Sequence, residues 1–324
     1  MVEETVIFAL TSSKKLAGDI AKELGIPLGN IDVAHFADGE ILVTPHETVR
    51  GRSVFIIQST YAPVTERLME VLVCIDALKR ASAAEINVIM PYFGYARQDR
   101  KAEPHQPITA KLVADMLTVA GADRIVTVDL HAAQIQGYFN IPIDDLTAVP
   151  LLGHYFKNFD KENLVVVSPD HGGVTRARKL AEILNTPIAI VDKRRPRPNE
   201  VEAQNVIGDV DGKVAIVIDD ICDTAGSLCA ACNIVKEHGA KEVYAAITHG
   251  VFSKDAMKTI DESPIEKMVI SDTIPLPEDD RYVSPKIVQL SVADMLAETI
   301  DAIQNHTSVS RVYDQYMTKT LKEK

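Results

Sequence analysis

Short apolar runs rich in β-branched residues alternate with helical patterns along most of this chain, and this alternation limits the fold more than any other feature. The helical patterns include 64–81, 109–120 and 173–184. The strand-like runs are Thr5–Leu10, Ser53–Gln58, Ile86–Met90, Arg124–Asp129, Leu164–Ser168, Ile188–Asp192, Val214–Asp219 and Glu242–Thr248. Strands that alternate with helices form parallel sheets covered by helices. We therefore predict an α/β fold of mostly parallel sheets flanked by helices.

One arrangement of strand, polar loop and helix occurs twice, about half a chain apart. The first copy covers 52–72 and the second covers 213–233. The repetition predicts two related units, 1–148 and 149–324, with the C-terminal segment packing back on the first unit. Only the second copy carries acids and a glycine in its loop. We expect a working loop in the second unit and a degenerate one in the first.

The loop of the second copy has the composition of a sugar phosphate site. Asp219 and Asp220 end its apolar run, and the small, hydroxyl-rich stretch 223–227 leads into a helical pattern. Free N–H groups at a helix start and nearby hydroxyls bind phosphate. Carboxylates would repel a bare phosphate, so their presence favours sugar hydroxyls or a metal beside it. The structural alternative is a Ser/Thr helix cap after a solvated acidic turn.

Two cation-rich segments follow other predicted strands. Residues 97–101 read RQDRK, and such a loop suits a polyphosphate because arginine grips phosphate with paired donors. Residues 193–198 read KRRPRP, and the prolines favour a mobile arm that closes over a reacting polyphosphate. A solvated charge run and an exposed hairpin tip are the structural alternatives for these two segments.

A histidine and an acid follow two further predicted strands. His131 comes just after 124–129, and Asp170 comes just after 164–168. Mg²⁺ commonly takes one or two protein ligands together with phosphate oxygens, so the two residues together suggest a shared divalent metal. Each residue taken alone is more often a cap or a packed side chain.

Composition excludes several classes of protein. The formal net charge of −12 disfavours nucleic acid as a partner. No apolar run approaches the ~18 residues that a membrane span requires, and the N-terminal residues do not resemble a signal peptide. Four cysteines do not form a disulfide framework in 324 residues, so we expect a cytoplasmic protein. Cys229 and Cys232 are expected to be small buried helix residues.

Taken together, these segments closely resemble the ribose-phosphate pyrophosphokinase family, also called phosphoribosyl diphosphate synthetases, over nearly the whole chain. VIDDICDTAGS alone is shared in type with phosphoribosyltransferases, whereas the order and combination of segments are specific. The matching segments are FADGE (36–40), PYFGYARQDRK (91–101), DLHAAQIQGYF (129–139), SPDHGGVTRAR (168–178), KRRPRPNEVE (193–202) and VIDDICDTAGS (217–227).

The resemblance implies two phosphoribosyltransferase-like domains and a reaction of nucleotide biosynthesis. Members of the family move the β,γ-diphosphate of Mg-ATP to the anomeric hydroxyl of ribose 5-phosphate, which gives 5-phosphoribosyl 1-diphosphate and AMP. By resemblance, Lys193 and Arg195 are catalytic, and His131 and Asp170 bind Mg²⁺. The implied ATP residues are Phe36, Asp38, Glu40, Arg97, Gln98, Asp99 and His131, and the implied ribose 5-phosphate residues are Asp219, Asp220, Asp223, Thr224, Ala225, Gly226 and Ser227.

The resemblance also implies assembly and regulation. The family's common class forms homohexamers in which residues 36–40 reach the nucleotide of a neighbouring subunit. Inorganic phosphate activates this class and ADP inhibits it at a separate site between subunits. The residues that match the effector site are Thr48, Arg50, Arg80, Ser82, Gln136, Asp144, Ser308 and Ser310.

Two other functions fit parts of the pattern. A catalytically silent homologue that regulates a synthetase would show altered arm or phosphate-loop residues, and both segments look intact here. A phosphoribosyltransferase, which consumes the activated sugar, would not need two units with one degenerate loop or the arginines of 97–101. We therefore expect the active synthetase.

Overall fold

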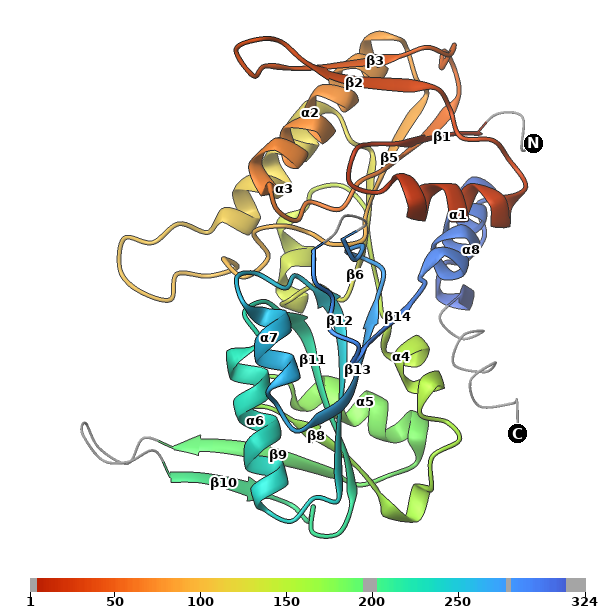
Figure 1. Cartoon of the computed structure of the whole chain (residues 1–324). Helices are drawn as coiled ribbons and strands as arrows, with labels where there is room; N and C mark the ends of the chain where they lie inside the picture. Colours follow the sequence, from red (N-terminus) through yellow and green to blue (C-terminus); the bar gives the residue numbers. More distant parts are fainter. Residues whose placement is uncertain (1–4, 195–202, 278–280, 313–324) are drawn as a thin grey trace. The chain divides into compact units, whose positions relative to one another are not determined.

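The structure is a computed structural model that describes residues 5–194, 203–277 and 281–312 (Figure 1). The chain divides into two compact units. The described residues of the first unit fall within Met1–Thr147, Thr273–Pro275 and Ser291–Asp314, and those of the second fall within Ala148–Asp272 and Leu276–Leu290. No described helix is both long enough and apolar enough to cross a membrane.

The first unit is built on a parallel five-stranded sheet in the order β1-β4-β5-β6-β7. Its strands are β1 (Thr5–Ala9), β4 (Ser53–Ile57), β5 (Glu85–Met90), β6 (Arg124–Val128) and β7 (Ile143–Leu146). Helices α2 (Val64–Arg80) and α3 (Thr109–Ala120) bury Leu68, Ile75 and Leu117 in the main core of this unit. Helix α1 (Lys14–Leu24) packs against α8 (Ala293–Gln304), which therefore belongs to this unit although it lies near the C-terminus (Figure 1).

The first unit also contains an antiparallel hairpin of β2 (Ile31–His35) and β3 (Ile41–Pro45). Residues 36–40 form its tip, where the N–H of Phe36 donates to the Glu40 carbonyl at 2.8 Å and the N–H of Gly39 donates to the Phe36 carbonyl at 2.9 Å. Gly39 has a φ of 94°, a conformation that glycine adopts without strain. Backbone hydrogen bonds therefore define the tip, and the Phe36 side chain is exposed.

The second unit has a seven-stranded sheet in the order β10-β9-β8-β11-β12-β13-β14. Its pairings are parallel except for β9 with β10. The strands are β8 (Leu164–Ser168), β9 (Ile188–Arg194), β10 (Ala203–Ile207), β11 (Val214–Cys222), β12 (Glu242–Gly250), β13 (Ile265–Ser271) and β14 (Ile287–Leu290), and the helices are α4 (Val149–Tyr155), α5 (Val174–Leu184), α6 (Gly226–Glu237) and α7 (Ala256–Asp261).

Each face of the second sheet has its own buried core. On β11, Ala215 and Val217 share a core with α6 and α7, whereas Ile216 and Ile218 share a core with α4 and α5. Successive side chains of a strand point to opposite faces, so a strand that is covered on both sides must be apolar throughout. The predicted α/β class with mostly parallel sheets is confirmed in both units.

The cysteines also behave as expected. All four are buried free thiols, and Cys229 and Cys232 lie on α6. Burial raises the pKa of both thiols, which keeps them protonated near neutral pH. The prediction that the CxxC pair consists of small buried helix residues is therefore confirmed.

Candidate active site

The start of α6 provides a backbone site suited to an anion. Ala225 precedes the helix with a φ of 63°, and no side chain caps the first turn. Thr224, Gly226 and Ser227 are exposed. A Cβ added to Gly226 would meet only the Thr224 hydroxyl, at 3.8 Å. The first N–H groups of a helix have no partner within it, so this exposed, uncapped turn can receive a phosphate.

The loop before α6 is fixed by the segment that follows β12. The N–H of Ser253 donates to the Asp223 carbonyl at 2.9 Å, and the N–H of Phe252 donates to the Cys222 carbonyl at 3.1 Å. Phe252 has a φ of 51°, which is unusual for a bulky residue.

Helix α6 begins two residues earlier than the sequence suggested, so Gly226 and Ser227 form its first turn.

Strand β11 extends further than predicted. We expected the strand to end at Asp219, but it continues through Cys222, so Asp219 and Asp220 lie inside the strand. Parallel pairing with β12 continues as far as Cys222 opposite Gly250, which explains the longer strand. The acids are thus held by the sheet itself.

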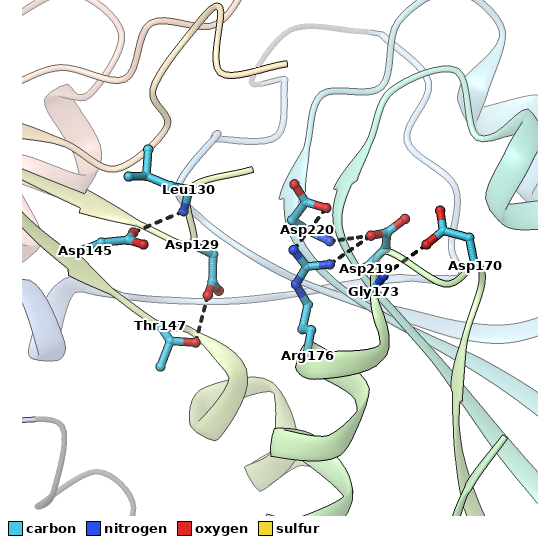
Figure 2. A network of polar contacts seen from close by, with 9 residues as sticks. All are labelled: Asp129, Leu130, Asp145, Thr147, Asp170, Gly173, Arg176, Asp219 and Asp220. Carbon is cyan, nitrogen blue, oxygen red and sulfur yellow. Dashed lines mark hydrogen bonds and ion pairs between the residues drawn. The ribbon is translucent and has the colours of Figure 1, made fainter. Parts of the chain in front are cut away.

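Arg176, in the first turn of α5, binds both acids (Figure 2). Its Nη1 donates to Asp219 Oδ1 at 3.0 Å, and its Nη2 lies 3.2 Å from Asp220 Oδ1. Asp219 Oδ1 also accepts the N–H of Asp220 at 2.9 Å. Sequence reasoning missed Arg176, and its position within SPDHGGVTRAR was the only signal available.

The surroundings of Asp219 raise the pKa of its carboxyl. Burial is the largest effect and, together with the charge of Asp220 and a hydrogen bond to it, raises the pKa of Asp219 to about 7. Arg176 and the N–H of Asp220 act in the opposite direction. The carboxyl of Asp219 therefore changes charge close to neutral pH.

Replacing Asp219 by asparagine should raise the free energy of unfolding at pH 8. Because folding raises this pKa from 3.8 to about 7, the stability contributed by the protonated carboxyl is present below pH 3.8 and is lost as the pH rises through about 7. Asparagine stays neutral, so the variant should gain roughly 1 kcal/mol at pH 8, below the limit of about 4 kcal/mol set by the full shift. Urea unfolding at pH 5 and pH 8 measures this, and a variant that is less stable than the parent at pH 8 would contradict it.

Asp170 is held in place by the turn between β8 and α5. The Ser168 hydroxyl donates to the Asp170 carbonyl at 2.6 Å. The N–H of Gly173 donates to Asp170 Oδ1 at 3.0 Å (Figure 2). The residue is exposed. Next to it, His171 Nε2 lies 3.0 Å from Oδ1 of the buried Asp192 on β9. The turn that carries Asp170 is therefore tied to the strand that leads into the basic arm.

The basic arm begins within the sheet. We expected the whole segment from Lys193 onward to be unpacked, but Lys193 and Arg194 belong to β9 and pair with Gln204 and Ala203 of β10. This antiparallel ladder explains the difference. Residues 195–202, which include Arg195 and Arg197, lie outside the described part of the chain.

In the first unit, the loop 97–101 is anchored by the buried Asp99. Its carboxylate accepts a hydrogen bond from Gln134, and its carbonyl accepts one from the Tyr138 hydroxyl. Arg97 and Gln98 are exposed, although the Gln98 side-chain carbonyl accepts a hydrogen bond from Thr109 at the start of α3. Asp99 therefore positions the loop, and its neighbours Arg97 and Gln98 face solvent.

The loop that carries His131 is held by two acids. Asp145 Oδ1 accepts the N–H of Leu130 at 3.0 Å, and Asp129 accepts the Thr147 hydroxyl at 2.7 Å (Figure 2). Asp145 Oδ1 also accepts the Thr127 hydroxyl at 3.1 Å. His131 is exposed. Sequence reasoning did not single out Asp145, because its strand β7 was not predicted.

The turn 223–227 that opens α6 is called the phosphate cradle below, and the corresponding loop of the first unit differs from it chemically. Gln58 and Ser59 stand where the second unit has Asp219 and Asp220. The Gln58 amide donates to the buried Glu70 at 2.7 Å and accepts the Ser12 hydroxyl at 2.7 Å. Helix α2 starts after Pro63, which has no N–H, and its first turn carries Glu66. Negative charge and a missing donor make this helix start a poor phosphate site.

The proposed effector residues all belong to the first unit, and some of them contact one another. Arg50 Nη1 donates to the Ser82 hydroxyl at 3.1 Å. Arg80 pairs with Asp76 at 2.7 Å, and Asp144 pairs with Arg124. Thr48, Gln136, Ser308 and Ser310 are exposed. Arg50 therefore contacts Ser82, whereas Arg80 and Asp144 each form an ion pair with another residue of the first unit.

Among the described residues, no group of three or more His, Cys, Asp or Glu side chains could hold a metal ion. His131 and Asp170 lie in different units. Mg²⁺ keeps several waters and takes phosphate oxygens as ligands, so one or two exposed protein ligands of this kind are compatible with it.

Comparison with known proteins identifies the family. A profile described as the N-terminal domain of ribose phosphate pyrophosphokinase matches residues 5–121, and one described as the phosphoribosyl synthetase-associated domain matches residues 195–314. The chain is 57% identical over 309 residues to a ribose-phosphate pyrophosphokinase of Listeria ivanovii, covering 95% of this chain and 96% of that protein. It is 56% identical over 308 residues to the Bacillus caldolyticus protein of the same name, covering 95% and 97%.

A solved structure gives the same result for the fold. The crystal structure of phosphoribosylpyrophosphate synthetase from Mycobacterium smegmatis matches with a TM-score of 0.88 and 43% identity, covering 94% of this chain and 99% of that one. The resemblance seen in the sequence segments is therefore confirmed along nearly the whole chain. The chain belongs to the ribose-phosphate pyrophosphokinase family.

Proposed function

We propose that this protein transfers the β,γ-diphosphate of ATP to the anomeric hydroxyl of ribose 5-phosphate and releases 5-phosphoribosyl 1-diphosphate and AMP. The observation that carries the proposal is the exposed, uncapped start of α6 beside Asp219 and Asp220 on β11. A phosphate bound at the helix start and ring hydroxyls bound to the two carboxylates would be the two ends of one pentose phosphate. Family membership at more than 50% identity supports the same reaction.

In this mechanism the protein mainly aligns the reactants. The N–H groups at the start of α6 hold the 5-phosphate, and Asp219 and Asp220 orient the ring hydroxyls. The oxygen of the anomeric hydroxyl attacks the β-phosphorus of ATP in line while its proton passes to solvent, the bond from the β-phosphorus to the oxygen bridging to the α-phosphate breaks, and AMP leaves. Lys193 and Arg195 neutralise the charge that develops on the diphosphate. No protein nucleophile is needed.

The nucleotide is assigned to the residues of the first unit. Arg97 and Gln98 would contact the phosphates, with Asp99 holding their loop, while Phe36, Asp38 and Glu40 would contact adenine. The exposure of Phe36, Arg97 and Gln98 supports this assignment. His131 and Asp170 would hold Mg²⁺, which when bound neutralises charge on the triphosphate.

Assembly, regulation and location are part of the same proposal. Family membership supports a homohexamer in which the 36–40 hairpin tip reaches a neighbouring subunit. Phosphate and ADP are proposed effectors at the site containing Arg50 and Ser82, whose side chains contact each other. The reaction is proposed to occur in the cytoplasm, where thiols stay reduced, and the four cysteines are free thiols.

The experiment that tests the proposal is a coupled assay for AMP in the presence of Mg²⁺ and phosphate. Active synthetase should release AMP from ATP only when ribose 5-phosphate is present. A silent regulatory homologue would release none. A phosphoribosyltransferase would instead consume 5-phosphoribosyl 1-diphosphate in the presence of a base, and this activity would contradict the proposal.

A further inference from the structure

Arg176, on α5, contacts both acids of the candidate sugar site on β11. Its guanidinium lies between Asp219 and Asp220 and contacts Oδ1 of each, at 3.0 and 3.2 Å (Figure 2). The exposed fractions of the side chains are 17% for Arg176, 28% for Asp219 and 6% for Asp220. Ion pairs at such low exposure are weakly screened, and a guanidinium offers paired donors in one plane.

The stability of α5 does not explain an arginine at this position. Arg176 lies in the first turn, where the helix dipole disfavours a cation, and no acid in that turn compensates for it. Arg178, two positions further along, is exposed. The placement of Arg176 is explained by the acids on β11, which would otherwise repel each other on consecutive residues.

We propose that Arg176 is a positioning residue that fixes Asp219 and Asp220 in one relative orientation for the ring hydroxyls of the pentose. The inference rests on the proposed function and deepens it. Two hydroxyls on adjacent ring carbons require two acceptors at a set spacing. The planar guanidinium of Arg176, which binds both carboxylates, fixes that spacing. Arg176 acts through the acids and does not itself contact the sugar.

The test compares Arg176→Gln and Arg176→Lys with Arg178→Gln, which removes the same charge from the exposed side of the same helix. Removing a charged hydrogen-bond partner should raise the KM for ribose 5-phosphate about 10- to 100-fold. The KM for ATP should change less than about twofold, since the nucleotide is assigned to other residues. Lysine should restore only part of the affinity because one ammonium lacks the paired donors, and Arg178→Gln should match the parent.

A second measurement separates positioning from a general loss of structure. With 2-deoxyribose 5-phosphate, which lacks one ring hydroxyl, the ratio of variant KM to parent KM should shrink, whereas a merely structural defect would leave that ratio unchanged. Thermal unfolding checks that each variant is folded, and Arg176→Lys supplies the answer if the glutamine variant does not fold.

The outcomes are distinct. An unchanged KM for ribose 5-phosphate, an equal rise in the KM for ATP, or full restoration by lysine would overturn the role of Arg176 while the proposed function stands. Parent enzyme that releases no AMP in response to ribose 5-phosphate would overturn the proposed function itself.

Discussion

Replacing Gly226 by valine should raise the KM for ribose 5-phosphate on the order of 10²- to 10³-fold, the loss expected when several hydrogen bonds to a charged group are removed together. A Cβ at this position meets only the Thr224 hydroxyl, at 3.8 Å, so the folded chain has room for a Cβ there. That room is the space through which a phosphate would approach the first N–H groups of α6. Initial-rate kinetics with each substrate varied, together with calorimetric titration of ribose 5-phosphate, measure the effect.

The control for this variant is Gly18→Val. Gly18 lies within α1 of the first unit, and a Cβ there meets nothing within 4 Å. The same atoms are added to a helix in both cases, so the control should retain parental kinetics and stability. Equal ribose 5-phosphate kinetics for the Gly226 variant and the parent would show that the cradle does not hold the phosphate.

Replacing Lys193 by alanine should lower kcat on the order of 10²- to 10³-fold, the effect typical of losing one electrostatic donor that acts in the transition state. Lys193 continues β9, which is tied to the turn of Asp170 through His171 and Asp192. If the lysine stabilises charge that develops during transfer, the KM for ATP should change little. Arg195→Ala is expected to act in the same direction.

Lys241→Ala is the matched control for charge. Lys241 is exposed and immediately precedes β12, at the end of the sheet opposite to the carboxyl ends of the strands. Its loss should leave both kinetic constants unchanged. If Lys193→Ala raises only the KM for ATP and leaves kcat intact, the arm binds nucleotide without assisting the chemical step.

The sequence predicted the elements whose signals are local. The apolar runs 164–167 of β8 and 214–218 of β11 stand out because both faces of the second sheet are covered, and such runs therefore mark buried parallel strands. The small residues 223–227 likewise predicted a turn that opens a helix. These features depend on residues adjacent in the chain.

The missed elements depend on tertiary pairing. Among the strands that were not predicted, β7 and β14 are short, partly buried edge strands, and β2, β3 and β10 are paired antiparallel. Strand β13, which is mostly buried between β12 and β14, was missed as well. Pairing with β12 extends β11 to Cys222, even though the strand then includes two acids. Strand length was therefore underestimated where a neighbouring strand continued the ladder.

Positioning residues were missed for a related reason. Arg176 is 43 residues from Asp219, and Gln134 is 35 residues from Asp99. Motif spacing along the chain identifies residues that share a loop, but it gives no information on which distant side chain orients them. The candidate ligand contacts could thus be proposed from the sequence, whereas the groups that hold them in place required the structure.

The most direct measurement is a crystal structure of the protein soaked with ribose 5-phosphate. We expect the phosphate oxygens within hydrogen-bond distance of the backbone nitrogens at 225–227, with the ring hydroxyls facing Asp219 and Asp220. Density for the ester at the 97–101 loop, with the start of α6 left to solvent, would contradict the assignment of the sugar phosphate site.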